Sequence, residues 1–273
     1  MTVESNDAAS MATMVGFDNT NVIDSIGGWN FPSGYFSDMV SSQESRSKFI
    51  ASAKSFLSQH KLAGIDIDWE FPCSAPRTAS VKITCQQFRN VADSGGKCPD
   101  DTTNFVQFLK ELRAGLGPDV KITVASQAAE KNARNQGVNK ESSSYVDAWN
   151  VMSYDYSVSD ISGAGAQIMS PNAPLYNPSA PALQMSINQT VSTYLSLGVP
   201  ASKINVGIPF YGHTWFMPGL SHPGQFGGSG KIQGECCGPF KQTFGAKPGK
   251  GCSQCGLMMY TEIQAALGSG GDR

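Results

Sequence analysis

Three carboxylic acids stand at alternate positions in the segment Asp66-Ile67-Asp68-Trp69-Glu70. Side chains alternate between the two faces of a β-strand, so a strand here places Asp66, Asp68 and Glu70 on one face, with neighbouring acids about 7 Å apart. Like charges at short range raise the pKa of at least one carboxyl group. Glu70 lies nearest the carboxyl end of the strand. We therefore predict that Glu70 donates a proton, and that Asp68 holds a hydrogen bond to it.

Two other interpretations of the acidic segment were weighed against acid catalysis. The acids could form the solvated face of an exposed edge strand, but the apolar residues Ile65, Ile67 and Trp69 on the opposite face favour a buried strand. The acids could instead bind a hard cation such as Ca²⁺ or Mg²⁺, which takes oxygen ligands. A rigid strand supplies no ligand loop, so we rank cation binding below acid catalysis and expect no metal.

The segments around these acids alternate between strand and helix periodicity. In the helical segments, apolar side chains recur every three to four residues, and Ser41 with Glu44 forms a capping box before the first helix. Alternation of strands and helices predicts an α/β fold with a parallel sheet, and a closed (β/α) barrel needs eight such strands. The expected strands span residues 22–27, 64–70, 120–126, 148–154 and 204–210, and the expected helices span residues 44–58, 103–115 and 186–197.

The chain changes character after Tyr211, where glycine and cysteine become frequent. We expect a poorly defined N-terminal segment over residues 1–20, the catalytic (β/α) barrel portion over residues 21–211, and an insertion subdomain over residues 212–273.

Composition excludes several classes of protein and suggests a compartment. The formal net charge of −2 gives no electrostatic attraction to nucleic acid or to an acidic membrane. No apolar run approaches the roughly 18 residues that a membrane span needs. All seven cysteines lie in polar or Gly/Pro-rich segments, which is typical of disulfides in an oxidising compartment. A zinc site is the alternative that we rank lower for Cys236, Cys237, Cys252 and Cys255.

Four short motifs, in chain order, resemble those of glycoside hydrolase family 18, which includes many chitinases. Residues 63–70 are similar to the family pattern D-G-x-D-x-D-x-E, with Ala63 in place of the first acid. Residues 25–29, 152–155 and 207–212 are similar to the S-x-G-G, M-x-Y-D and seventh-strand motifs of the family. Each motif lies at the carboxyl end of an expected strand, where barrel enzymes build their active sites.

The resemblance implies an incomplete (β/α)8 TIM barrel of the family 18 type, with a small α+β insertion after strand seven. Strands three to seven would be present and strands one, two and eight absent, so we expect a fragment. The open sheet edges at residues 22–27 and 204–210 predict that the isolated chain aggregates or forms oligomers, whereas the full-length protein is expected to be a monomer.

The resemblance also implies a mechanism, in which β-1,4 bonds between N-acetylglucosamine units are cleaved with retention and the substrate's own acetamide oxygen is the nucleophile. Glu70 is then the acid and base, Asp68 orients the acetamide, Asp66 tunes the protonation of Asp68, and Tyr154 donates its hydroxyl to the acetamide oxygen. Substrate contacts are implied for Asp155, Tyr211, Met152 and Trp29.

From the resemblance we expect a secreted hydrolase of the endochitinase type that binds chitin or chito-oligosaccharides and needs no cofactor. Neither nucleic acid nor a membrane is expected as a partner. The alternatives are a lectin-like chitin-binding protein, an inactive fragment, and an endo-β-N-acetylglucosaminidase that acts on N-glycan cores. Lectin-like relatives usually lose the terminal acid, and the retention of Glu70 favours an enzyme.

Overall fold

In a computed structural model, the 273-residue chain forms two compact units. The first unit comprises Met1–Val81, Asp93–Val151 and Val191–Val206, and the second comprises Lys82–Ala92, Met152–Thr190 and Gly207–Arg273. The described residues are 15–16, 21–29, 31, 33–73, 100–156, 167–168, 171–177, 185–213, 229–230, 257–260 and 264. The predicted cysteine cluster and the segment 1–14 lie outside these residues.

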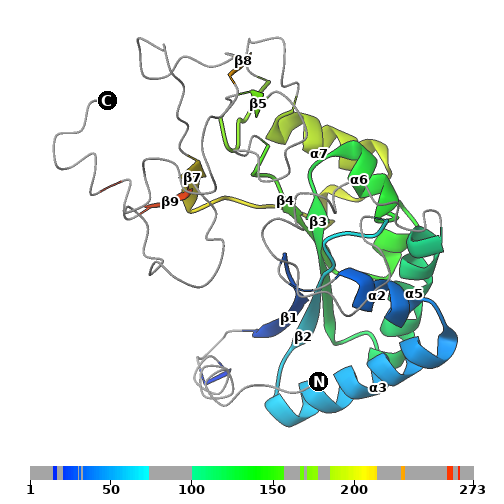
Figure 1. Cartoon of the computed structure of the whole chain (residues 1–273). Helices are drawn as coiled ribbons and strands as arrows, with labels where there is room; N and C mark the ends of the chain where they lie inside the picture. The colour runs from blue at the N-terminus through cyan, green and yellow to red at the C-terminus, as the bar shows by residue number, and fades with distance from the viewer. Residues whose placement is uncertain are drawn as a thin grey trace. The chain divides into compact units, whose positions relative to one another are not determined.

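A five-stranded sheet forms the centre of the first unit, with the strand order β1-β2-β3-β4-β6 (Figure 1). The pairs β1/β2, β2/β3 and β4/β6 are parallel, and neighbours in the sheet follow the order of the chain. All five predicted strands are therefore present, and β1 and β6 are the first and last strands of this sheet. The strands are β1 Ile23–Gly27, β2 Gly64–Asp68, β3 Lys121–Gln127, β4 Ala148–Met152 and β6 Ile204–Val206.

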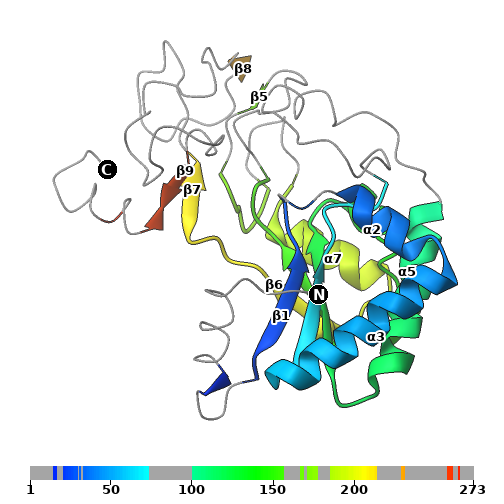
Figure 2. The same cartoon turned by 60° about the horizontal axis from the view of Figure 1, so that its bottom comes forward.

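Helices α2, α3 and α5 lie side by side along one face of this sheet, as both views show (Figures 1 and 2). Their apolar stripes bury the helix-facing side chains of β2, so that Ile67 packs in one core with Phe105 and Leu109. This core fixes the orientation of β2 and hence the face on which its acids lie. The helices are α2 Ser33–Val40, α3 Gln43–His60, α5 Asp100–Leu116, α6 Glu130–Asn135 and α7 Ile187–Ser196, and Ser142–Ser144 and Ala201–Lys203 are short 3₁₀ helices.

Three strands end earlier than the sequence predicts. β2 ends at Asp68 rather than at residue 70, β4 at Met152 rather than at 154, and β6 at Val206 rather than at 210. The residues that follow bond to loops instead of to a neighbouring strand; the hydroxyl of Ser153, for example, donates to the Gly207 carbonyl oxygen at 2.8 Å. The alternating pattern continues in the sequence, but the ladder of backbone hydrogen bonds does not.

The predicted capping box of α3 is wrong by one residue. Ser42, not Ser41, is the N-cap, because its Oγ accepts a hydrogen bond from the Ser45 N–H at 3.1 Å. The Ser41 hydroxyl instead donates to the Asp38 carbonyl oxygen at 2.7 Å. The helix consequently begins at Gln43, and Glu44 lies in its first turn, where a negative charge suits the helix dipole.

The second unit contains two small antiparallel sheets. β5 (Gln167–Ile168) pairs with β8 (Ser229–Gly230), and β7 (Tyr211–His213) pairs with β9 (Leu257–Met259). Tyr211 was expected just after the fifth strand of the large sheet, and it is instead the first residue of β7. In the part of the chain that the structure describes, no helix has both the length and the apolarity to cross a membrane.

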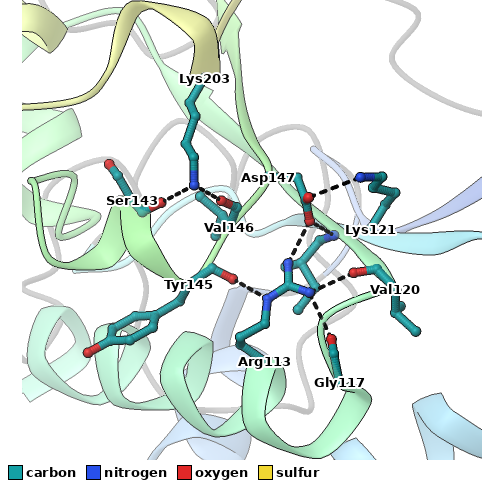
Figure 3. A network of polar contacts seen from close by, with 10 residues as sticks. Arg113, Gly117, Val120, Lys121, Ser143, Tyr145, Val146, Asp147 and Lys203 are labelled. Carbon is teal, nitrogen blue, oxygen red and sulfur yellow. Dashed lines mark hydrogen bonds and ion pairs between the residues drawn. The ribbon is translucent and has the colours of Figure 1, made fainter.

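Arg113 joins α5 to the amino ends of β3 and β4 (Figure 3). Its guanidinium donates to the carbonyl oxygens of Gly117, Val120 and Tyr145 at 2.9, 2.7 and 3.0 Å. It also forms an ion pair with Asp147, with 2.5 Å between Nη2 and Oδ2. One side chain thus satisfies three main-chain acceptors and a carboxylate, which stabilises the loops that lead into both strands.

Asp147 is the second centre of this network (Figure 3). Its Oδ2 accepts from the Ile122 N–H at 2.9 Å, and its Oδ1 lies 3.3 Å from the Lys121 Nζ. Burial alone would raise the pKa of Asp147, but the hydrogen bonds from Ile122 and Arg113 and the Arg113 charge outweigh it and hold the pKa below its usual value. Asp147 therefore stays ionised at neutral pH and keeps its partners.

Candidate active site

The acidic strand β2 has one apolar and one acidic face, as the sequence predicts. Ile65, Ile67 and Trp69 are 1%, 0% and 0% exposed, and they belong to the core that the helices cover. Asp66 lies on the opposite face and is only 7% exposed. Because β2 is paired with both β1 and β3, the interpretation of the acids as the solvated face of an edge strand is wrong.

Three hydrogen-bond donors from three strands surround the Asp66 carboxylate. Oδ1 accepts from the Thr123 hydroxyl at 2.5 Å and from the Asn150 amide at 2.9 Å, and Oδ2 accepts from the Ser25 hydroxyl at 2.8 Å. These donors balance the buried negative charge. Sequence reasoning missed Ser25, Thr123 and Asn150. Ser25 and Thr123 stand directly opposite Asp66 in the two neighbouring strands, so the register of the sheet would have pointed to them.

Asp68 is the carboxyl group whose protonation the fold changes most clearly. Its Oδ1 is buried, and among the described residues it accepts no hydrogen bond. Burial and, secondarily, the negative charge of Asp66 raise the pKa of Asp68 from 3.8 to about 6. The group therefore exchanges its proton close to neutral pH. This property suits a carboxyl group that shares a proton with a neighbouring acid during catalysis.

Two glycines hold the end of β1 against Asp68. The Gly28 N–H donates to the Asp68 carbonyl oxygen at 2.9 Å. Gly27 has a φ of +118°, and a Cβ built on it would lie 2.0 Å from the same oxygen, so that no other residue fits this position. The S-x-G-G motif thus provides the close approach that brings Trp29 to the side of the acidic segment.

Glu70 and Trp29 lie just beyond the carboxyl ends of β2 and β1. Glu70 is half-buried, and its peptide bond to Phe71 is cis. Trp29 is 46% exposed, and its ring lies 6.5 Å from that of Phe71, centroid to centroid. Trp29 is therefore a surface residue and not part of the core, whereas Trp149 is fully buried as predicted.

The remaining predicted residues belong to the second unit; they are the last residue of β4, two residues of the segment that follows it, and the first residue of β7. The rings of Tyr154 and Tyr211 meet edge to face, with centroids 6.1 Å apart. Asp155 is exposed with a φ of 57°, and its N–H donates to the Asn172 Oδ1 at 2.9 Å. Asn172 Nδ2 in turn donates to the Tyr211 carbonyl oxygen at 3.3 Å, and Met152 is half-buried.

Asn172 is the connection between these segments that sequence reasoning missed. It lies in an irregular stretch without periodicity, so no local pattern singles it out. The eight predicted residues thus form two sets, one in each compact unit: Asp66, Asp68, Glu70 and Trp29 in the first, and Met152, Tyr154, Asp155 and Tyr211 in the second. Within the described ranges, no group of three or more His, Cys, Asp or Glu residues has the arrangement of a metal site.

The chain matches the model of glycosyl hydrolases family 18 over residues 4–272. It belongs to this family. The residues that the sequence predicts for the site all lie within the matched range.

Curated relatives in family 18 include bacterial and animal chitinases. The chain is 33% identical to Chitinase A1 of Niallia circulans over 211 residues, which cover 72% of this chain and 27% of that protein. It is 30% identical to chitotriosidase-1 of Mus musculus over 210 residues, which cover 73% of this chain and 40% of the mouse protein. The chain thus spans well under half the length of each of these two relatives.

Solved structures of the family have the same fold. Chitinase ChiA74 from Bacillus thuringiensis matches 94% of this chain and 39% of its own, with a TM-score of 0.72 and 26% identity. The Ostrinia furnacalis Group IV chitinase in complex with allosamidin matches 98% of this chain and 64% of its own, with a TM-score of 0.73 and 25% identity. The fold class is therefore α/β, and the described sheet is consistent with an incomplete TIM barrel.

Proposed function

We propose that this chain carries the acid centre of a chitinase that cleaves β-1,4 bonds between N-acetylglucosamine units. One observation carries the proposal: Asp68, with a pKa raised to about 6, stands between the hydrogen-bonded Asp66 and the terminal acid Glu70. The names of the relatives support the substrate class, since chitinases and a chitotriosidase are among them.

In the proposed mechanism, Glu70 protonates the glycosidic oxygen and later removes a proton from water. The acetamide oxygen of the substrate is the nucleophile, so the protein supplies one strong acid rather than an acid and a carboxylate nucleophile. Asp68 accepts a hydrogen bond from the acetamide N–H and orients it. Asp66, whose two oxygens accept three hydrogen bonds, adds to the effect of burial in raising the pKa of Asp68. The outcome is hydrolysis with retention.

Most of the proposed substrate contacts come from the second unit. Tyr154 donates its hydroxyl to the acetamide oxygen, and Asp155 and Tyr211 hydrogen-bond the sugar near the bond that is cleaved. Met152 is a further proposed contact from the second unit, and the exposed ring of Trp29, in the first unit, is proposed to stack on a sugar face. The hydrogen bonds of Asn172 to Asp155 and to Tyr211 support this grouping, because they fix two of the proposed contacts relative to each other.

We further propose that the protein is of the endochitinase type, is exported, and works as a monomer when complete. Cys73 is disulfide-bonded, and every other cysteine of the chain lies outside the described residues. A disulfide is typical of proteins that fold in an oxidising compartment. Chitin and chito-oligosaccharides are the proposed binding partners, and the chemistry requires no cofactor.

Hydrolysis of a fluorogenic chitotriose substrate by the chain and by its Glu70→Gln variant tests the proposal. We expect turnover by the wild type and its loss in Glu70→Gln, with binding of chitotetraose retained. Glu44→Gln, at an exposed helix position, is the matched control and should leave turnover unchanged. A wild-type chain that binds chitotetraose without hydrolysing a substrate would establish the lectin-like alternative instead.

The stereochemistry provides a second test. The proposed mechanism releases the β-anomer first, which ¹H NMR of the early products detects. Initial release of the α-anomer would contradict the role of the acetamide as nucleophile, even if Glu70 were essential.

A further inference from the structure

One serine hydroxyl connects the two residues that flank Glu70. The indole N–H of Trp69 donates to the Ser33 Oγ at 2.7 Å. The Ser33 hydroxyl in turn donates to the Phe71 carbonyl oxygen at 3.2 Å. The bridge thus runs from the side chain before Glu70 to the main chain after it. Ser33 is the first residue of α2 and is far from the acidic segment in sequence.

Both ends of this bridge are firmly held. The Trp69 side chain is fully buried, stacks on Phe36 with ring centroids 5.6 Å apart, and meets the edge of Phe105 at 5.4 Å. Phe36 belongs to α2, as Ser33 does, so the helix touches Trp69 through both an apolar and a polar contact. Movement of the Trp69 ring would cost packing as well as a hydrogen bond.

A second polar link holds the chain just beyond the bridge. The Cys73 N–H donates to the Asp101 Oδ2 at 3.1 Å, and the Ser37 hydroxyl donates to the Asp101 Oδ1 at 2.6 Å. Ser37 lies one helical turn after Ser33 on α2, and Asp101 is the second residue of α5. The segment from Trp69 to Cys73 is therefore held at several points by α2 and α5, and the Ser33 hydroxyl is the point nearest Glu70 in sequence.

We propose that Ser33 is a positioning residue that ties the side chain before Glu70 to the main chain after it and so aims the Glu70 carboxyl group. The inference rests on the proposed role of Glu70 as the acid. Ser33 itself is not assigned a contact with substrate. Loss of the hydroxyl leaves the buried Trp69 N–H without its acceptor and the Phe71 carbonyl without this donor, and the segment that carries Glu70 is then free to shift.

The expected effect is on the chemical step. A displacement of about 1 Å in a reacting group can cost about 100-fold in rate, so we expect Ser33→Ala to lower kcat by about 10- to 100-fold. KM for the fluorogenic chitotriose substrate should change less than threefold, because Ser33 has no proposed part in sugar binding. Ser33→Thr keeps the hydroxyl at the start of a helix, where threonine is tolerated, and should restore most of kcat.

The chain contains a closely matched control. The indole N–H of fully buried Trp149 donates to the Ser143 Oγ at 3.0 Å, and that hydroxyl donates to the Asn139 carbonyl oxygen at 2.6 Å. This bridge joins the same chemical groups as the Ser33 bridge, but its serine lies before β4 and its tryptophan near the amino end of that strand. Ser143→Ala should therefore lose similar stability and leave kcat and KM unchanged.

The experiment measures kcat, KM and thermal unfolding for the wild type, Ser33→Ala, Ser33→Thr and Ser143→Ala. Each kcat is divided by the fraction of the protein that is folded. A selective loss of kcat in Ser33→Ala, with recovery in Ser33→Thr, supports the inference. Equal effects of Ser33→Ala and Ser143→Ala, or no recovery by threonine, would overturn it and leave the proposed function intact. Absence of turnover in the folded wild type would instead remove the proposed function, and the positioning role with it.

Discussion

Replacement of Asp66 by asparagine should lower the pKa of Asp68. The substitution removes a negative charge and preserves the local contacts. The asparagine oxygen can still accept from Thr123 and Asn150, and its amide N–H can donate to the Ser25 hydroxyl, which reverses the direction of that one hydrogen bond. The electrostatic effect is therefore separated from a packing effect, which a change to alanine would not achieve.

The structure bounds the size of the effect. The pKa of Asp68 stands about two units above its ordinary value of 3.8, and burial is a larger cause than the Asp66 charge. Asp66 therefore accounts for about one unit or less. The sign is fixed, because a nearby like charge favours the protonated form of an acid. Asp66→Asn should bring the pKa of Asp68 down from about 6 by up to about one unit.

Carboxyl ¹³C chemical shifts of aspartate-labelled protein, followed from pH 3 to pH 8, measure this pKa directly. Asp68→Asn assigns the signal by removing it. Asp38→Asn, at an exposed position of α2, is the control and should leave the Asp68 titration unchanged. An unchanged or raised pKa in Asp66→Asn would refute the electrostatic coupling of the two acids, whatever the effect on activity.

Three further predictions concern stability. The pKa of Asp68 is higher in the folded than in the unfolded chain, so ionisation of Asp68 destabilises the fold as pH rises from about 4 to about 6. Asp68→Asn should therefore melt at a higher temperature than the wild type at pH 7. Below pH 4 this difference should disappear. Ser42→Ala should lower the free energy of unfolding by about 1 kcal/mol in urea titrations, and Ser41→Ala by less than about 0.5 kcal/mol. Arg113→Met should cost about 2 to 3 kcal/mol, because three carbonyl groups lose this donor and Asp147 loses its ion pair with Arg113 while keeping the Ile122 N–H and Lys121. Loss of the exposed Arg134 pair should cost about 0.5 kcal/mol or less. A smaller loss for Arg113→Met than for Arg134→Met would contradict the role given to the network.

The sheet could be predicted from sequence because its strands carry their own signal. β2 combines β-branched residues with strict alternation, and the core confirms which face is apolar. The ends of the strands could not be predicted, because alternation continues through Trp69-Glu70 and through Ser153-Tyr154 although the backbone pairing has stopped. Helix α2 was missed because it has only eight residues and is held by tertiary contacts such as that of Phe36 with Trp69.

The cap of α3 shows the same limit on a smaller scale. Ser41 and Glu44 have the spacing of a capping box, whereas Ser42 is followed three residues later by another serine. The Ser42 hydroxyl nevertheless caps the helix and also contacts the Ser45 hydroxyl at 2.7 Å. Where two candidate N-cap residues are adjacent, the spacing to a later glutamate does not show which one caps the helix. The geometry of the preceding turn decides it.

The acids of the site were predictable, and their environment was not. Asp66 and Asp68 lie in β2, and Glu70 follows two residues after the strand ends, so the pattern of the three acids is local. The donors to Asp66 come from three other strands, and which residues stand opposite one another depends on sheet register. The Ser33 bridge and the Asn172 contacts likewise join segments distant in sequence, and neither can be derived from one chain segment taken alone.

The Arg113 network affects which parts of the sequence can change during evolution. It secures β3 and β4 at their amino ends (Figure 3). Asp68, Glu70 and Met152, by contrast, lie at or just beyond the carboxyl ends of their strands. Substitutions in the segments that follow the strands therefore leave this anchor intact. Such substitutions can accumulate without loss of the fold. A combinatorial library directed at the residues after β1 and β4 should accordingly retain more folded members than one of equal size directed at the residues before β3 and β4.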